Sequence, residues 1–232
     1  MLFTKVVAGA LIGAALLTTG CGSKGADSHA APSSSAADTV HRTPEQDSLI
    51  ARADRARIQG SATAPVWIIE VSDFQCPFCR QFHQQTYPTI LKDYVQTGKV
   101  RFAYINFPIP SLHRNAWPAA LAAMCVAAQG KFWPMHDSLF NAQDRWESGD
   151  PSPVIDSLAA SLGLDMKSYH NCVSSQLMRP LIQADKDRAE SRGVNSTPTF
   201  LIGDTTLVGA QPIGNFRQVL DSMLAKTAAK GG

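Results

Sequence analysis

The sequence of 232 residues has little excess charge of either sign, because 21 Lys and Arg residues nearly balance 19 Asp and Glu residues. A net charge of +2 provides no basic stripe, so a nucleic acid is not expected as a partner. Hydrophobic residues make up 44% of the chain and charged residues 17%, which is ordinary for a globular protein. The length suffices for one sizeable core, or for one domain with a substantial insertion.

The chain also lacks a hydrophobic run long enough to cross a membrane as a helix. The apolar run at residues 6–17 falls short of the roughly 20 residues that a spanning helix needs. It follows the positive charge of Lys5, and this order is typical of a secretory signal. Residues 1–20 are therefore predicted to be a signal peptide, and the mature protein is expected to lie outside the cytoplasm without a transmembrane helix.

The signal ends in LLTTGC at Cys21, and this segment resembles a bacterial lipoprotein signal, in which the cysteine becomes the acylated N-terminus. The usual pattern has an aliphatic residue three positions before the cysteine, where this chain has Thr18, with Leu17 one place early. The resemblance implies lipidation of Cys21 and a membrane anchor on the periplasmic side. Ordinary cleavage that leaves the cysteine unmodified is the alternative.

Residues 22–44 contain small and polar residues that cannot form a core, and they are predicted to be a flexible tether. A short amphipathic helix is expected next, in EQDSLIARADRAR, with Leu49, Ile50 and Ile58 as candidate contacts. These features predict a tether and short helix over residues 21–60, followed by a folded domain over residues 61–227.

Cysteines are few, and only one pair is closely spaced. If Cys21 is acylated, four remain, which allow three pairings: Cys76, Cys79, Cys125 and Cys172. The simplest pairing joins the close pair and leaves the other two for each other. A structural zinc site usually uses two close-spaced ligand pairs, so no metal is expected. Four histidines in the folded part of the chain are interpreted as solvated, surface or capping residues and not as metal ligands: His83, His113, His136 and His170.

The close pair follows a segment that is typical of a buried strand. Residues 66–74, VWIIEVSDF, are apolar and rich in β-branched residues. Pro77 then suits the first turn of a helix, with a kink expected at Pro88. Cys76 would lie at the helix N-terminus, where unpaired N–H groups favour the thiolate over the thiol. We therefore predict that Cys76 is a reactive thiol and that Cys79, one turn later, is the shielded resolving thiol.

Glu70 lies in the middle of the apolar strand, where a carboxylate is costly unless it has a partner or a role. It precedes the reactive cysteine by six residues. We predict that it lies beneath the cysteine pair with a raised pKa and relays a proton for Cys79. An edge-facing or salt-bridged Glu70 is the alternative.

Together these segments resemble the thioredoxin superfamily, and more narrowly its DsbA-like branch of exported thiol–disulfide oxidoreductases. The resemblance rests on WIIEVSDFQ, the C-P-F-C motif with Pro77 and Phe78, GVNSTPTFLIG at residues 193–203, and NAWPAALAAMCVAAQGKFWPMHDSLF. It implies a cis-proline at Pro198 that faces the cysteine pair. The backbone of Thr197 would then be free to pair with an extended substrate.

The same resemblance implies an α/β thioredoxin-like fold with an inserted all-helical subdomain at about residues 111–192. Residues 99–109 are expected to form a second strand, residues 200–210 a closing hairpin and residues 213–226 the last helix. Cys125 and Cys172 both fall in the insertion, where a structural disulfide between them is predicted, with two buried free thiols as the alternative.

The resemblance implies disulfide transfer to unfolded or reduced exported proteins, reoxidation by a membrane quinone-linked thiol oxidase, and no cofactor. A monomer is expected. Strong oxidants of this branch often carry a histidine between the cysteines, and Phe78 in that place favours a less oxidising couple. A thiol reductase or isomerase of the same fold, or a tethered non-catalytic binding module, is the alternative.

Overall fold

The computed structural model describes residues 42–230. The predicted signal peptide, Cys21 and nearly all of the predicted tether lie outside these residues. The strands are β1 (Ile58–Gln59), β2 (Val66–Ser72), β3 (Val100–Asn106), β4 (Thr199–Ile202) and β5 (Thr205–Val208). The helices are α1 (Pro44–Ala56), α2 (Pro77–Gln85), α3 (Tyr87–Ile90), the π-helix η1 (Leu91–Val95), α4 (Ala116–Ala127), α5 (Phe132–Asn141), α6 (Gln143–Trp146), α7 (Ser152–Ser161), α8 (Met166–Ser174), α9 (Arg179–Ser191) and α10 (Ile213–Lys230).

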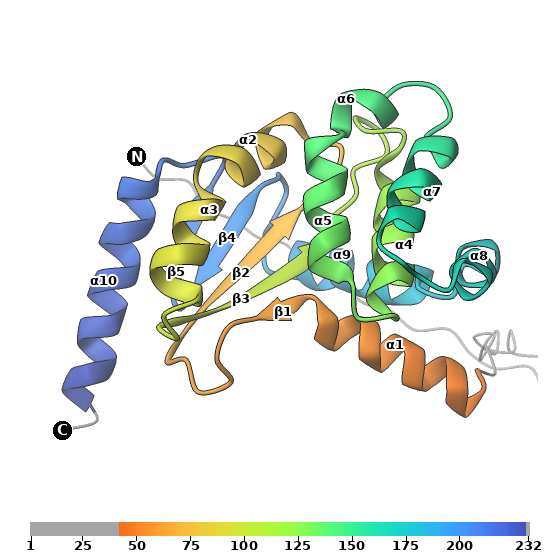
Figure 1. Cartoon of the computed structure of the whole chain (residues 1–232). Helices are drawn as coiled ribbons and strands as arrows, with labels where there is room; N and C mark the ends of the chain where they lie inside the picture. The colour runs from red at the N-terminus through yellow and green to blue at the C-terminus, as the bar shows by residue number, and fades with distance from the viewer. Residues whose placement is uncertain (1–41, 231–232) are drawn as a thin grey trace, which may run out of the picture. The chain divides into compact units, whose positions relative to one another are not determined.

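The five strands form one sheet in the order β1-β3-β2-β4-β5 (Figure 1). β2 and β3 run parallel, and the other neighbouring strands run antiparallel. The register pairs Glu70 of β2 with Tyr104 of β3 and with Phe200 of β4. Because paired residues point to the same side of a sheet, these three side chains share one face.

Helices α2 and α10 cover that face of the sheet. Phe82 of α2 and Phe216 of α10 both pack against Phe200, with ring centroids 4.3 and 4.9 Å apart. α9 covers the opposite face, where Ala189 packs in a small cluster with Val71 of β2. Helix α2 is therefore fixed on the sheet by an aromatic core.

The segment between β3 and β4 is helical, as predicted, and comprises α4 to α9 (Figure 1). α4 lies at its centre, because ten of its twelve residues are buried. A helix that is hydrophobic all round needs neighbours on every side, and α1, α5, α7, α8 and α9 provide them. In the described part of the chain, no helix combines the length and apolar character that crossing a bilayer requires.

Residues 44–60, predicted to belong to the tether and a short helix, are packed against the rest of the described chain. α1 has a capping box at Thr43 and Gln46, and its Leu49 and Ile50 pack on the insertion. Ile58 belongs to strand β1 and not to this helix. Arg57, which follows α1, is buried and forms an ion pair with buried Asp185 of α9. These contacts pack residues 44–60 against the domain that was predicted to begin at residue 61.

The other predicted elements agree with the structure. The strands at residues 66–74 and 99–109 contain β2 and β3, and the closing hairpin predicted at residues 200–210 matches β4 and β5 except that β4 begins one residue earlier. The expected kink at Pro88 appears as a break at Thr86, where α2 ends and α3 begins. The predicted thioredoxin-like α/β fold with a helical insertion is confirmed.

Candidate active site

Cys76 and Cys79 lie at the start of α2, just after β2 ends at Ser72. Cys76 is the N-cap residue and Pro77 is the first residue of the helix. Pro77 has no N–H to leave unpaired, and its fixed φ suits this position. Both cysteines are free thiols, and both are buried, with 4% of Cys76 and none of Cys79 exposed.

The two thiols have opposite pKa shifts. A hydrogen bond from the Cys79 thiol lowers the pKa of Cys76 to about 6, and the backbone N–H groups of Cys79 and Phe78 contribute in the same direction. Burial raises the pKa of Cys79 well above its usual value, and the charge on Cys76 raises it further. At neutral pH the pair therefore holds one thiolate, on Cys76, and one proton, on Cys79.

The loop before β4 faces Cys76. The Thr197–Pro198 peptide bond is cis. The Cys76 sulfur lies 3.5 Å from the carbonyl oxygen of Thr197, to which the thiol form can donate a hydrogen bond. This contact requires the proton, so it favours the thiol and opposes the stabilisation of the thiolate by the helix N-terminus. The sequence-predicted residues Cys76, Cys79, Thr197 and Pro198 thus lie together.

Glu70 is 1% exposed, and neither of its carboxylate oxygens has a hydrogen-bond partner among residues 42–230. Burial raises the pKa of Glu70 to about 8, and the negative charge of Cys76 adds to this shift. Glu70 is therefore neither edge-facing nor paired with a cation among residues 42–230, which were the alternatives considered from the sequence. Glu70 therefore holds a proton at neutral pH in the neighbourhood of the cysteine pair.

Two further polar groups lie near Glu70, and the sequence analysis did not identify them. Ser72 and Tyr104 are buried on the same face of the sheet, and their hydroxyl oxygens have no hydrogen-bond partner in the described part of the chain. Burial raises the pKa of Tyr104, and negative charge on Glu70 and Cys79 raises it further. Ser72 was detectable as the next residue on Glu70's side of β2. Tyr104 lies in β3, far from Glu70 in the chain, and only the strand register places the two residues side by side.

Asp73 holds the turn between β2 and α2. Its buried carboxylate accepts hydrogen bonds from the backbone N–H groups of Gln75 and Ile109, at 2.8 and 3.0 Å, and lies 2.8 Å from Nδ1 of His113. This contact raises the pKa of His113, and the charge of Cys76 acts in the same direction. His113 is thus partly buried beside the active-site turn, where the sequence was interpreted as placing a surface or capping residue.

His83 and His136 are also buried, which corrects their interpretation as solvated or capping residues. The His83 ring in α2 packs 5.1 Å from the Phe140 ring and 5.1 Å from the His136 ring of α5. The inserted helix α5 covers the side of α2 that would otherwise face solvent. With Asp137, these histidines form the one group of possible metal ligands found within residues 42–230.

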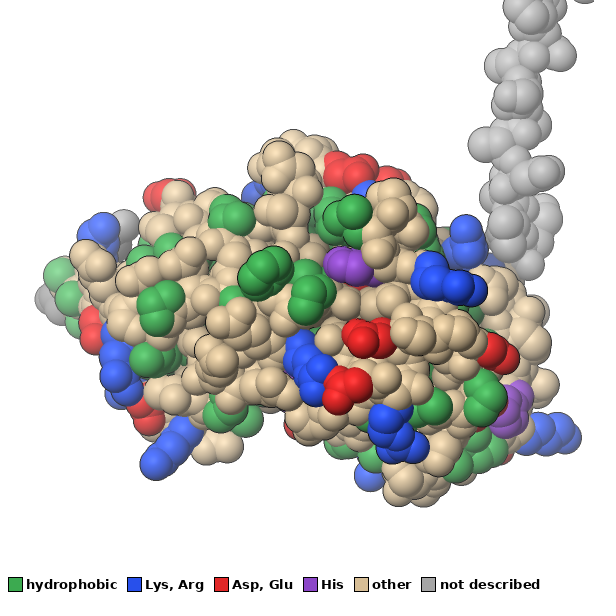
Figure 2. Space-filling view, turned by 90° about the horizontal axis from the view of Figure 1, so that it is seen from above, with side chains coloured by type: hydrophobic (Ala, Val, Ile, Leu, Met, Phe, Trp, Pro, Cys, Tyr) green, Lys and Arg blue, Asp and Glu red, His purple; other side chains and the backbone are tan. Residues whose placement is uncertain are grey.

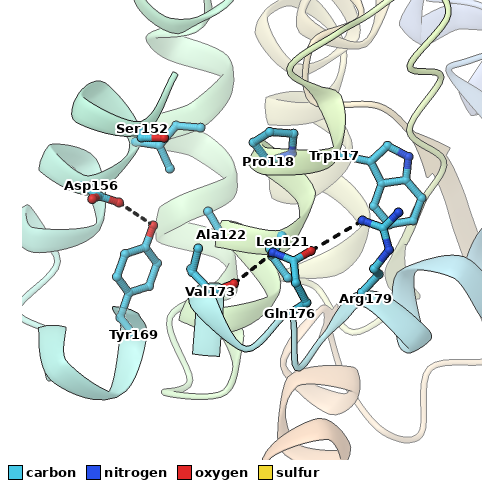
Figure 3. A pocket seen from close by; sticks show the side chains of 11 residues that line it. Trp117, Pro118, Leu121, Ala122, Ser152, Asp156, Tyr169, Val173, Gln176 and Arg179 are labelled. Carbon is cyan, nitrogen blue, oxygen red and sulfur yellow. Dashed lines mark hydrogen bonds between the residues drawn. The ribbon is translucent and has the colours of Figure 1, made fainter. Parts of the chain in front are cut away.

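Cys125 of α4 and Cys172 of α8 form a disulfide with an S–S distance of 2.09 Å. A cavity of about 220 Å³ lies in the insertion, with Trp117, Leu121 and Val173 in its wall (Figure 3). Tyr169 donates a hydrogen bond to Asp156 there, and Arg179 lies over the Trp117 ring. None of the cysteine-pair residues lines this cavity.

A hollow of about 450 Å³ does lie beside the cysteine pair. It is lined by Phe78, Gln81, Ser196, Thr197, Val208, Gly209 and Ala210. Phe78 is 59% exposed and Val208 is 52% exposed, although both are large hydrophobic residues. Seen from the end of the sheet where α2 begins, hydrophobic side chains lie among uncharged ones in the middle of the surface (Figure 2). Such a surface suits apolar segments of another chain.

Comparison with curated proteins finds two kinds of relative. The chain is 33% identical over 149 residues to Na(+)/H(+) antiporter NhaA 3 of Salinispora tropica, covering 64% of this chain but only 22% of that protein. It therefore spans about a fifth of the antiporter's length. It is 23% identical over 171 residues to disulfide bond formation protein D of Bacillus subtilis, covering 72% of this chain and 76% of that protein.

Among solved structures, the chain is similar to α-DsbA1 of Wolbachia pipientis, with a TM-score of 0.69 and 24% sequence identity, covering 76% of this chain and 94% of that one. A family model described as thioredoxin matches residues 52–222, which include the C-P-F-C helix, the insertion and the cis-proline loop. The predicted resemblance is thereby confirmed, and the chain belongs to the thioredoxin family.

Proposed function

We propose that the protein is an exported thiol–disulfide oxidoreductase that donates the Cys76–Cys79 disulfide to reduced, folding proteins. The observation that carries this proposal is the asymmetry of the two thiols, with the pKa of Cys76 lowered to about 6 and that of buried Cys79 raised. A thiolate that is stabilised in the reduced protein makes the corresponding disulfide a better oxidant.

The first step is an attack by a substrate thiolate on the sulfur of Cys76 in the oxidised protein. The substrate–Cys76 bond forms as the Cys76–Cys79 bond breaks, and the electron pair passes to the Cys79 sulfur. Buried Cys79 needs a proton, and Glu70, with a pKa raised to about 8, holds one at neutral pH. Glu70 is therefore proposed as the proton donor to Cys79, and Ser72 and Tyr104 as polar neighbours of the path.

A second substrate thiolate then attacks the substrate sulfur of the mixed disulfide. This step forms the substrate disulfide and releases Cys76 as a thiolate, so two electrons remain on the protein. The exposed side chains of Phe78 and Val208 and the backbone of Thr197 are proposed to hold the substrate chain beside Cys76. A membrane quinone-linked thiol oxidase is the proposed reoxidant.

Export is supported by the signal-like residues 1–20 and by the Cys125–Cys172 disulfide, since disulfides persist outside the cytoplasm. We propose that this disulfide stabilises the insertion and that Cys21 is acylated, which anchors the protein to a membrane. Metabolic labelling with a fatty acid tests the anchor. Label that disappears in Cys21→Ala supports it, and label in neither protein contradicts it.

A reductase is the second candidate, and Phe78 between the cysteines is the observation that favours it, because no imidazole is present there to lower the Cys76 pKa further. Disulfide transfer tests the activity itself. Oxidised protein is mixed with a reduced, unfolded polypeptide, and the substrate thiols are counted over time. Loss of these thiols in parallel with reduction of the Cys76–Cys79 bond supports the donor. No transfer from a protein with this bond intact would favour the non-catalytic binding module.

A further inference from the structure

Two buried histidines and one carboxylate meet between the active-site helix and the insertion. His83 lies near the C-terminal end of α2, and His136 and Asp137 follow one another in α5. One potential ligand atom from each of the three side chains lies within 4.8 Å of the other two. We refer to these residues as the His–Asp cluster. The four-cysteine zinc site rejected from the sequence shares no residue with it.

Two of the three separations within the cluster can be compared with those in a small coordination sphere. Nδ1 of His136 lies 2.8 Å from Oδ1 of Asp137, and Nδ1 of His83 lies 3.9 Å from the same oxygen. Ligand atoms bound to one tetrahedral zinc ion at its usual bond lengths are about 3.3 Å apart. The observed separations lie on either side of this value. The Asp137 side chain is 50% exposed, so it can rotate to adjust both separations.

A second observation points to a ligand in the same place. Nδ1 of His83 has no hydrogen-bond partner among residues 42–230. It cannot bond freely to solvent either, because the residue is buried and only 8% exposed. A buried ring nitrogen is costly to leave unpaired. Burial also favours the uncharged imidazole, which is the form that coordinates a metal ion. A metal ion would supply the partner that Nδ1 of His83 lacks.

We propose that His83, His136 and Asp137 bind a divalent transition-metal ion of the zinc type, with a water molecule as the fourth ligand. Two imidazoles and one carboxylate are ligands that Zn²⁺ accepts, and the exposed side of Asp137 provides a route of entry. The bound ion would connect α2, which carries Cys76 and Cys79, to α5 of the insertion. This role is separate from the thiol chemistry and holds whichever direction that chemistry takes.

Calorimetric titration of the full chain with Zn²⁺ tests the proposal. The Cys76–Cys79 disulfide is kept formed, so that these thiols cannot bind the ion. His83→Phe removes one ligand but keeps an aromatic ring against Phe140. Asp137→Ala removes a half-exposed ligand. His170→Ala is the matched control, because His170 is an exposed histidine 3.9 Å from a carboxylate oxygen of Asp156.

We expect saturable binding of Zn²⁺ that weakens at least tenfold in His83→Phe and in Asp137→Ala and is unchanged in His170→Ala. Zn²⁺ should also raise the unfolding temperature of the parent protein more than that of either cluster variant, because an ion that binds only the folded state stabilises it. Equal affinity in all four proteins, or no saturable binding to the parent, would overturn the proposal. Neither result would bear on disulfide transfer, which is measured without added metal.

Discussion

The sulfur of Cys76 lies 3.5 Å from the carbonyl oxygen of Thr197, the residue joined to Pro198 by a cis peptide bond. The two residues are far apart in the chain, and the sheet brings them together because β2 and β4 are neighbours. The carbonyl accepts a hydrogen bond only while Cys76 keeps its proton. The lowered pKa of Cys76 therefore comes from hydrogen-bond donors, which are the Cys79 thiol, the Thr197 side chain and the backbone N–H groups at the start of α2.

The Cys79 thiol contributes most to that acidity, since its hydrogen bond is the largest cause of the lowered pKa of Cys76. In Cys79→Ala we expect the pKa of Cys76 to rise from about 6, because the donor is removed. Cys79→Ser is the matched control, since the serine hydroxyl can still donate a hydrogen bond. The pKa of Cys76 in this variant should lie closer to that of the parent. Thiolate absorbance against pH measures the Cys76 pKa in the parent and in both variants. Equal values in Cys79→Ala and the reduced parent would exclude this role of Cys79.

Phe78 offers a gain-of-acidity test. It is 59% exposed, so replacing it should disturb the core little. In Phe78→His we expect a protonated imidazole beside Cys76 to lower the Cys76 pKa by about one unit and to make the couple more oxidising. Phe78→Gln, which is polar but uncharged, separates the effect of charge from that of polarity. A shift of the same size in both variants would show that the imidazole charge is not the cause.

Glu70 should make stability depend on pH. Its pKa is about 8 in the folded protein, above its ordinary value, so the folded state binds more protons than the unfolded state between about pH 4.5 and 8. Stability should therefore fall as pH rises through this window, by on the order of 5 kcal/mol at about 1.36 kcal/mol per pKa unit. Above the folded-state pKa of Glu70, this contribution to stability is completely lost.

The variant Glu70→Gln has no such proton, and we expect its stability to change much less between pH 5 and 9. Urea unfolding of the oxidised protein, in which Cys76 does not titrate, measures the difference between variant and parent. The rate of disulfide transfer should fall in the same variant, since Cys79 loses its proton donor. Parallel stability curves for parent and variant would argue against a buried, protonated Glu70.

The insertion should depend on its disulfide for stability. A bond between Cys125 and Cys172 closes a loop of about 48 residues, which corresponds to ~4 kcal/mol in the chain-entropy model. We expect the double variant Cys125→Ala, Cys172→Ala to lose stability of this order while the Cys76–Cys79 reduction potential stays unchanged. A large change in that potential would mean that the second disulfide takes part in the redox chemistry.

Local sequence patterns were sufficient to predict the part of the site that is continuous along the chain. The strand before the cysteines, Pro77 at the first helical position and a carboxylate in an apolar strand identify Cys76, Cys79 and Glu70, because each pattern acts within a few residues. The position of Pro198 came only from the family resemblance, since a lone X-Pro bond is usually trans.

The remaining parts depend on contacts between distant segments. Tyr104 joins Glu70 through strand register, and His113 reaches Asp73 across 40 positions. His83 and His136 looked solvated because each is a polar residue on a helix, and only the packing of α5 on α2 buries them. The packing of residues 44–60 has the same origin, because Arg57 finds its partner Asp185 far along the chain.

The reduction potential of the Cys76–Cys79 couple, measured by equilibration with glutathione, tests the proposed direction of the chemistry most directly. A Cys76 pKa of about 6 lies between the values for thioredoxin and for the strongest periplasmic oxidant. We therefore expect a potential between about −230 and −120 mV, where the protein donates its disulfide. A value near −270 mV, roughly that of thioredoxin, would contradict the donor and identify a reductase.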